Sequence, residues 1–338
     1  MSNLKEYIES YNDFYDETEG AGLGIHMVHF LLRNSGIDPS VFQIISQNGT
    51  TKAIFSVPFQ LRPHEVTTTI KEQIHEEVRL LPTLPSNVTE LITLCKETNP
   101  RIIDIANRIA SDPSLTADVL KLANSASKGS DEKIDTVKDA MESIGITNLE
   151  ELLLTAGAKK ILMQRYVAFV DVWTHCQKTA IYASILARRY RLKKISGYVY
   201  MSGLLHDLGK IILLSISKSI TDKIGEILSD KAIQATTLVE EISIGISHST
   251  IGAMMTKKWY FPDYLTEIID HHHSPLNAPD HLRDQTFITY LANMLCGIED
   301  NHYKYAYIEE DVLRRFGIHN EEDLNTLLKE CQAYRKGV

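Results

Sequence analysis

Apolar residues recur with a helical spacing over most of the chain, from about residue 76 onward. In the segment NPRIIDIANRIA, Ile102, Ile105 and Ile109 fall on one face of a helix. The next segment, DPSLTADVLKLANSA, repeats this design, with Asp112 placed to cap the helix N-terminus ahead of an apolar stripe. This spacing predicts a mainly α-helical protein.

The same spacing predicts further helices. Thr147 and Glu150 have the spacing of a capping box and mark the start of one of them. We find no repeat of fixed period and no heptad run long enough for a coiled coil. The predicted helices cover residues 149–162, 172–191, 197–216, 235–258, 263–273, 283–298, 308–318 and 321–334.

The first 75 residues show a mixed pattern. Residues 41–46 and 51–57 are rich in strand-forming side chains, and Asn48-Gly49 lies between them. An Asn-Gly pair between two such runs favours a β-hairpin. Residues 25–36 have the pattern of a short helix that ends at Gly36. We therefore expect a small α/β module, whose role the sequence does not assign.

The end of one predicted helix, LANSA at 122–126, has two interpretations. Asn124 and Ser125 either form a surface for a partner or simply terminate the helix with their side chains. The sequence leaves both open.

Composition narrows the expected partners. The chain has 338 residues, of which 43% are hydrophobic and 23% charged, with a formal net charge of -9. This acidic balance disfavours broad electrostatic binding to nucleic acid or to anionic lipid. The N-terminus is polar and acidic, unlike a signal peptide, and charges or glycines interrupt the apolar stretches before they would span a bilayer. We expect a cytoplasmic protein with no nucleic-acid or membrane partner.

The cysteines point to the same compartment. The four of them are far apart in the sequence and form no CxxC pair: Cys95, Cys176, Cys296 and Cys331. This pattern argues against a disulfide framework or a thiolate zinc site, and it is typical of a reducing cytosol.

Five of the thirteen histidines, with one aspartate, form the strongest chemical signal. Each lies on a predicted helix or at a helix end, so an antiparallel bundle would bring them into one site. Imidazole and carboxylate ligands without thiolate suit iron, manganese, nickel or zinc. The candidate ligands are His175, His206, Asp207, His248, His272 and His273.

Two considerations limit this interpretation. A single histidine on an apolar helix is more often a core residue with its hydrogen bonds satisfied than a ligand. Adjacent helical residues also diverge by about 100°, so His206 and Asp207 both reach one metal only if it straddles their helix. Against this, paired polar residues with apolar flanks are costly to bury unless they have partners. In a working site, Lys210 would balance phosphate charge.

Residues from about 78 to 275 resemble an HDOD domain, the signalling relative of the HD and HD-GYP phosphohydrolases. Glu241, Trp259 and Pro262 also match. The segments that carry the resemblance are LPTLPSNVTELI (81–92), ASDPSLTADVLKLANSA (110–126), IDTVKDAMESIGITNLEELLL (134–154), VWTHCQKTAIYASILA (172–187), GLLHDLGKIIL (203–213), HSTIG (248–252) and HHSP (272–275).

The resemblance implies a mainly α fold, an HD-type multi-helix bundle preceded by the small α/β module. We expect a module at residues 1–75, the HDOD domain at 76–275, and a helical extension at 276–338 packed on its core. HDOD domains as a class are thought to have lost catalytic residues and to act as interaction or regulatory modules in bacterial signalling.

This chain keeps more of the metal-binding pattern than that description implies. The six candidate ligands match the HD-GYP arrangement, but two departures stand out. The Gly-Tyr-Pro signature after the paired histidines is replaced by SPLNAPDHL, and the closing aspartate becomes Asn293. An amide oxygen coordinates without bringing negative charge and cannot act as a base. His271 makes the run three histidines long, which leaves the register of the pair open by one residue.

We therefore carry two functional hypotheses. The favoured one is a regulatory module that binds signalling proteins or a small nucleotide-type ligand, with a divalent transition metal in a residual HD-type site. The alternative is an active metal-dependent phosphohydrolase acting on a nucleotide or cyclic dinucleotide, with Asp207 and Lys210 as catalytic residues and Asn293 added to the six ligands. The sequence does not decide whether the chain is an enzyme, although it favours a non-catalytic role, and homo-oligomerisation stays open.

Overall fold

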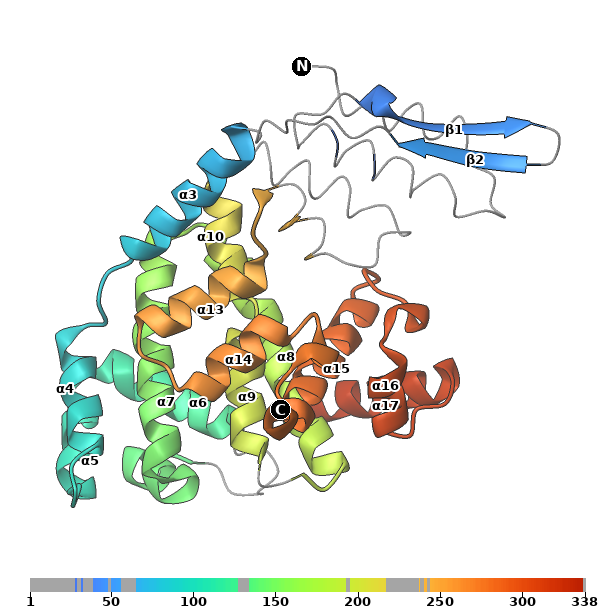
Figure 1. Ribbon diagram of the computed structural model, residues 1–338. Helices are drawn as coiled ribbons and strands as arrows, with labels where there is room; N and C mark the ends of the chain where they lie inside the picture. The colour runs from blue at the N-terminus through green and yellow to red at the C-terminus, as the bar shows by residue number, and fades with distance from the viewer. Residues whose placement is uncertain are drawn as a thin grey trace. The chain divides into compact units, whose positions relative to one another are not determined.

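The computed structural model describes residues 39–47, 50–55, 65–126, 134–192, 195–216 and 244–336, and five single residues: Val28, Leu32, Thr237, Glu240 and Glu241 (Figure 1). Each of its two units is made of two chain segments. Unit 1 comprises Met1–Glu76 and Ile216–Ser247, and unit 2 comprises Glu77–Ser215 and His248–Val338. The candidate ligands all belong to unit 2.

Unit 1 contains the predicted hairpin. A 3-10 turn at Pro39–Val41 leads into β1 (Phe42–Gln47), which pairs antiparallel with β2 (Thr50–Phe55). Gln47 pairs with Thr50, so the two-residue Asn-Gly connection sets the register. The hairpin prediction is confirmed. The helix predicted at 25–36 lies mostly outside the described residues, where Val28 and Leu32 are helical.

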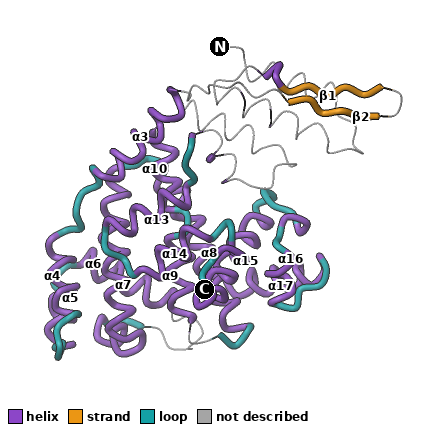
Figure 2. Tube along the Cα trace, viewed as in Figure 1, coloured by secondary structure: helices purple, strands orange, loops and turns teal. Residues whose placement is uncertain are grey.

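Helices account for nearly all the other described elements (Figure 2). Short 3-10 turns join some of them, at Pro275–Asn277, Asp280–Leu282 and Tyr305–Tyr307. The helices are α3 (Glu65–Arg79), α4 (Ser86–Cys95), α5 (Ile102–Ala110), α6 (Pro113–Ala126), α7 (Val137–Arg165), α8 (Phe169–Arg189), α9 (Ser196–Leu205), α10 (Leu208–Ile216), α13 (His248–Lys258), α14 (Asp263–His271), α15 (Arg283–Glu299), α16 (Glu310–Arg315) and α17 (Glu321–Lys336).

Three predicted boundaries are wrong. The helix expected at 235–258 is interrupted at residues 245–247, and α13 begins only at His248. The helix expected at 197–216 is broken in two, because α9 ends at Leu205 and α10 begins at Leu208. The helix expected from Leu149 is the second part of α7, which is kinked at Gly145 with a φ of 77°. A positive φ is accessible to glycine without steric cost, which allows the helix to change direction there.

One apolar stretch is longer than the sequence reasoning allowed. The segment Gly197–Ile216 is long and apolar enough to cross a membrane by length and composition, with a mean hydropathy of 1.3 over its best window. Within the fold, 78% of that window is buried. Burial of this extent is typical of a core helix in a globular domain. The segment, which forms α9 and α10, is therefore part of the core of unit 2.

α7 organises the first half of unit 2, where it packs against α4, α5 and α6. The predicted cap of α6 forms, because the Leu115 backbone N–H donates to Asp112 Oδ1 at 3.0 Å. At the other end of α6, Asn124 donates to the carbonyl of Ile134 at 2.7 Å and accepts from its N–H at 2.9 Å. Asn124 therefore joins α6 to the segment before α7, which favours a structural role for its side chain.

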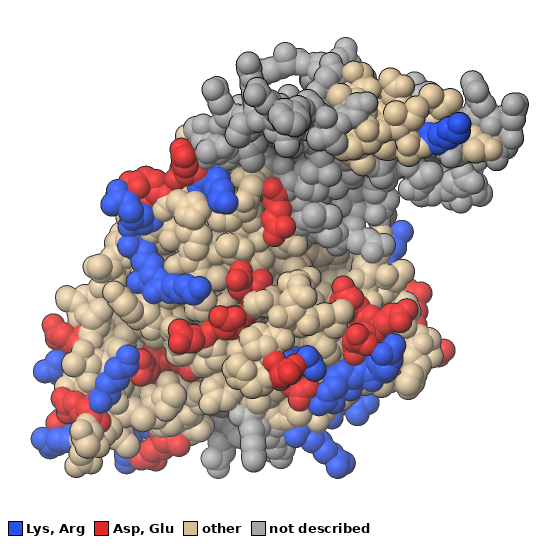
Figure 3. All heavy atoms as spheres, in the orientation of Figure 1, with Lys and Arg blue, Asp and Glu red and all other residues tan. Residues whose placement is uncertain are grey.

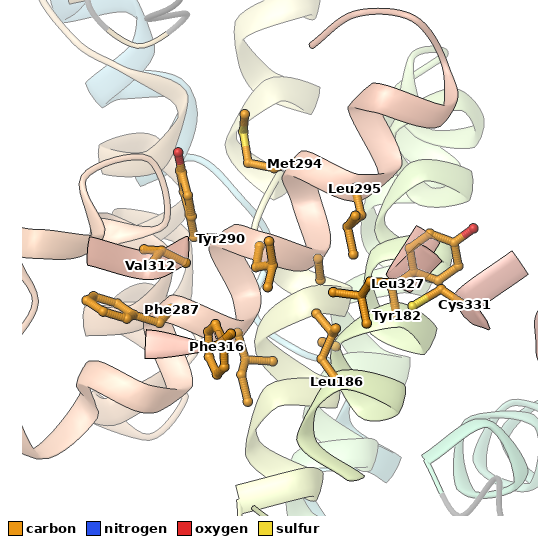
Figure 4. Packing of buried hydrophobic residues seen from close by; sticks show 14 of the residues in the cluster. Tyr182, Leu186, Phe287, Tyr290, Met294, Leu295, Val312, Phe316, Leu327 and Cys331 are labelled. Carbon is orange, nitrogen blue, oxygen red and sulfur yellow. The ribbon is translucent and has the colours of Figure 1, made fainter. Parts of the chain in front are cut away.

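The second half of unit 2 is built around an apolar core between α8, α15, α16 and α17 (Figure 4). Tyr182 and Leu186 come from α8, Leu295 from α15, and Leu327 from α17. The helices that follow residue 276 thus share one core with α8. On the face drawn in Figure 3, acidic and basic side chains lie side by side over the helical unit.

Candidate metal centre

Asp207 is the centre of a polar cluster at the point where the α9–α10 turn approaches α8, α13, α14 and α15. Its side chain is 2% exposed, and its two oxygens face different sets of histidines. The structure brings all seven predicted ligands, and Lys210, to this one place. Whether they bind a metal stays a prediction.

One carboxylate oxygen faces what we call the inner lobe, formed by Asp207, His248, His272 and His273. Asp207 Oδ1 lies 3.2 Å from His248 Nε2 and 3.5 Å from His272 Nε2. These two Nε2 atoms are 3.3 Å apart. The His273 ring centroid is 4.2 Å from that of His272, and one ligand atom from each of the four residues falls within 4.8 Å of the others.

The other oxygen faces the outer lobe, formed by His175, His206, Asp207 and Asn293. Asp207 Oδ2 lies 3.4 Å from His206 Nε2 and 3.5 Å from His175 Nε2. His175 Nε2 is also 3.0 Å from Asn293 Oδ1. Lys210 donates to the same Oδ2 at 2.7 Å, so this oxygen already has a cationic partner.

The break between α9 and α10 explains how adjacent residues reach one site. His206 is the residue that ends α9, and the Lys210 N–H donates to the Asp207 carbonyl at 2.9 Å in the turn that opens α10. The Asp207 backbone N–H donates to Cys176 on α8. His206 Nε2 and Asp207 Oδ2 are consequently only 3.4 Å apart. The expectation of a metal straddling a continuous helix was therefore wrong.

Backbone carbonyls orient two of the histidines. His206 Nδ1 lies 2.8 Å from the Gly203 carbonyl, and His272 Nδ1 lies 2.6 Å from the Ile269 carbonyl. A carbonyl only accepts, so each ring carries its proton on Nδ1 in these bonds and presents the Nε2 lone pair to Asp207's side of the cluster. This is the arrangement by which a second hydrogen bond orients a metal-binding imidazole.

Glycines bring the helices close enough for this cluster to form. A Cβ on Gly209 would lie 1.9 Å from the His248 carbonyl oxygen, and one on Gly203 would lie 2.8 Å from Ala180 Cα. Both neighbours are backbone atoms, which do not move aside as a flexible side chain does. Gly209 in LLHDLGK therefore lets α10 press against the start of α13, where His248 sits.

Burial sets the protonation of the cluster. It lowers the pKa of His272 to about 3 and that of His175 to about 4, and it holds the pKa of His273 well below its usual value. Burial alone would raise the pKa of Asp207, but His206 and Lys210 hold it well below the ordinary range. His175, His272 and His273 are thus neutral imidazoles beside an ionised carboxylate, the forms that bind metals.

Several buried polar atoms of the cluster have no hydrogen-bond partner within the described part of the chain. Such atoms are uncommon in native proteins, because each forfeits its hydration without compensation. They are His206 Nε2, Asp207 Oδ1, His273 Nε2 and Asn293 Nδ2. Three of these four are ligand atoms that a divalent ion would satisfy, so the donor set fits a transition metal such as iron, manganese, nickel or zinc.

The sequence reasoning missed a second buried acidic site. Glu151 on α7 is 1% exposed, and it accepts a hydrogen bond from the Tyr264 hydroxyl at 2.6 Å. Burial raises the pKa of Glu151 to about 7, and its Oε2 has no partner among the described residues. Tyr198 packs edge-on against Tyr264. In the sequence Glu151 is one acid among several on an amphipathic helix, so no local pattern identifies it.

Both tryptophans are core residues. Trp173 is 6% exposed and Trp259 is 2% exposed. The Trp259 Nε1–H donates to the Pro82 carbonyl at 2.9 Å, which ties the end of α13 to the segment before α4.

A curated relative covers almost the whole chain. It is an uncharacterized protein from Treponema pallidum (strain Nichols), 26% identical over 325 residues, which are 96% of this chain and 63% of the relative. The chain therefore spans less than two thirds of that protein's length.

Solved structures share the fold. An HDOD domain protein of unknown function from Geobacter sulfurreducens matches with a TM-score of 0.56 and 21% identity, over 80% of this chain and 94% of that one. A protein from Shewanella amazonensis, provisionally named a phosphohydrolase, matches with a TM-score of 0.57 and 22% identity, over 77% and 93%. The HDOD domain family itself matches residues 81–275, more than half of the chain. These matches, together with the helical bundle around the histidine cluster, show that the chain belongs to the HDOD domain family.

Proposed function

We propose that this protein is a regulatory module of cytoplasmic bacterial signalling, which binds a divalent transition metal in the Asp207 cluster and acts through a signalling protein or a small nucleotide-type ligand. The observation that carries the metal binding is the set of orphaned ligand atoms at the cluster, above all Asp207 Oδ1. The proposal includes the division into a module at 1–75, an HDOD domain at 76–275 and an extension at 276–338.

The regulatory role is supported by the charge of the site. Asp207 is the only carboxylate in the two lobes, and the position that the HD-GYP pattern fills with aspartate is Asn293. An amide cannot take a proton from an attacking water at neutral pH. Lys210 donates a hydrogen bond to Asp207 Oδ2 at 2.7 Å. Its positive charge is therefore already paired with the buried carboxylate and is less available to a phosphate.

A phosphohydrolase is the second candidate, and one observation favours it. Six histidine and aspartate ligands of the HD-GYP pattern are present and lie together, and only the closing aspartate is replaced, by Asn293. A bound divalent ion would lower the pKa of a coordinated water and polarise a phosphoryl oxygen. In that case His175 and Lys210, with side chains 26% and 27% exposed, are the residues of the cluster that substrate would meet.

Metal content and turnover together test the two roles. The full chain is purified without chelator, and its bound iron, manganese, nickel and zinc are quantified. Hydrolysis of a generic phosphodiester and of cyclic dinucleotides is then assayed with added manganese or iron. The control variant is His206→Ala, which removes a wholly buried histidine of the outer lobe.

The regulatory role predicts bound metal without turnover in the wild-type chain. Turnover that is lost in His206→Ala would replace the regulatory role with the enzyme. A chain that binds no metal at any concentration would contradict the metal-binding part of both candidates.

A further inference from the structure

The two lobes of the cluster differ in ways that decide how many ions it holds. We propose that the cluster binds a single divalent ion in the inner lobe, and that Asn293 leaves the outer lobe too weak to hold a second. This inference rests on the proposed metal binding, and it adds which residues hold the ion and which residue limits the number.

The inner lobe offers a complete set of ligands. Among the residues that the structure describes, Asp207 Oδ1 has no hydrogen-bond partner, and the Nε2 atoms of His248 and His272 lie within 3.5 Å of it. His273 supplies a fourth ligand atom within 4.8 Å of the others, and its Nε2 has no partner in the described part of the chain. Three imidazoles and one carboxylate are a sufficient protein ligand set for a transition metal.

Two of the outer lobe's ligand atoms are already engaged, while His206 Nε2 has no partner among the described residues. Asp207 Oδ2 accepts from the Lys210 ammonium at 2.7 Å, and that positive charge repels a cation on the same side. His175 Nε2 is 3.0 Å from Asn293 Oδ1, so an ion there would have to break this hydrogen bond. In return the ion would gain two imidazoles and a neutral amide oxygen.

Net charge separates the lobes further. The carboxylate of Asp207 partly neutralises the charge of one divalent ion. A second ion would add two more positive charges against the same single carboxylate, beside Lys210 and in a site sheltered from water. Uncompensated charge is costly in such a site. A carboxylate at position 293 would supply the missing negative charge to the outer lobe.

Metal stoichiometry tests this directly, with Co²⁺ as the probe because it prefers the same nitrogen and oxygen ligands and reports its coordination in its visible spectrum. The full chain is dialysed to equilibrium against Co²⁺, and bound metal per chain is measured. His273→Ala and His175→Ala form a matched pair, since both histidines are partly exposed and each belongs to one lobe only.

We expect one Co²⁺ per wild-type chain. His273→Ala should weaken binding at least about 100-fold, and His175→Ala should keep it within about tenfold, because removal of a ligand costs more than a change beside it. Asn293→Asp should raise the stoichiometry to two and add a second set of visible absorption bands. Circular dichroism of each variant checks that the fold is retained.

The outcomes that overturn the inference are distinct. Two Co²⁺ per wild-type chain, or loss of metal in His175→Ala with retention in His273→Ala, would contradict the assignment to the inner lobe. A stoichiometry of one in Asn293→Asp would contradict the role of Asn293. A wild-type chain without Co²⁺ would remove the proposed metal binding itself, and this inference with it.

Discussion

The apolar core and the Asp207 cluster share two helices, α8 and α15. α8 contributes Tyr182 and Leu186 to the core, and α15 contributes Leu295 (Figure 4). The same helices contribute His175 and Asn293 to the cluster. In the core, contacts are shared among many side chains from four helices. In the cluster, each interaction depends on one or two named atoms around a single carboxylate.

The core therefore stabilises the fold, whereas the cluster provides the groups that can bind a metal. Burial of apolar surface stabilises the folded state roughly in proportion to area, so the core does not depend on one atom. The cluster does not stabilise the fold in this way, because four of its buried polar atoms have no partner among the described residues, and each such atom costs free energy. We therefore expect stability and metal binding to respond to different substitutions.

The largest expected effect breaks the core. Leu295 is fully buried, and Leu295→Ala should lower the free energy of unfolding by about 2–5 kcal/mol, because it removes buried apolar surface and leaves a cavity. Urea unfolding gives the stability, and dialysis against Co²⁺ gives metal binding to the folded fraction. Leu276→Ala, at a side chain 44% exposed, is the matched control and should cost less than about 1 kcal/mol. Loss of metal binding in folded Leu295→Ala would contradict the separation.

The next effect tests a buried acid that belongs to neither region. The pKa of Glu151 is raised from 4.5 to about 7, so the folded state binds this proton more tightly than the unfolded state does. The free energy of unfolding should therefore fall as pH rises from about 4.5 to above 7, by up to about 3 kcal/mol for a shift of this size. Unfolding by urea at a series of pH values measures the slope.

Glu151→Gln is the control for that slope, since it keeps an acceptor for Tyr264 and removes the titration. Subtracting the two pH profiles cancels the contribution of the histidines. Profiles that run parallel between pH 5 and pH 8 would show that Glu151 does not titrate in this range.

A smaller expected effect links the two regions through the backbone. Gly209→Ala places a Cβ against the His248 carbonyl and should cost about 1–3 kcal/mol, because α10 and α13 must move apart. His248 moves with α13, so Co²⁺ affinity should fall as well. Gly197→Ala, where the Cβ meets only the Asn148 side chain at 3.3 Å, should leave Co²⁺ affinity unchanged. Equal affinities in the two variants would contradict the positioning role of Gly209.

Much of this architecture could be predicted from the sequence, because it follows local rules. The Asn-Gly pair set the hairpin register, Asp112 capped α6, and helical spacing located most helices. The site residues were recognisable because paired polar residues such as His206 and Asp207 are rare within apolar runs. Their convergence required only that the helices pack into one bundle.

The remaining features depend on contacts between distant segments. The break after Leu205 falls at the His206-Asp207 pair, where the Asp207 backbone N–H donates to Cys176 on α8, and no proline marks it in the sequence. The close approach at Gly209 is visible only once α13 is in place. Glu151 becomes unusual only because Tyr264 and the surrounding helices exclude water from it.

The buried cysteines have a practical consequence. All four thiols are buried and free, and burial raises the pKa of Cys95 to about 11 and that of Cys296 and Cys331 to about 12. Alkylating reagents attack the thiolate, so the folded chain should react slowly at neutral pH. Each labelling rate then measures how often one part of the fold opens. Cys331 reports on α17, and Cys176, which follows His175, reports on the opening of the cluster itself.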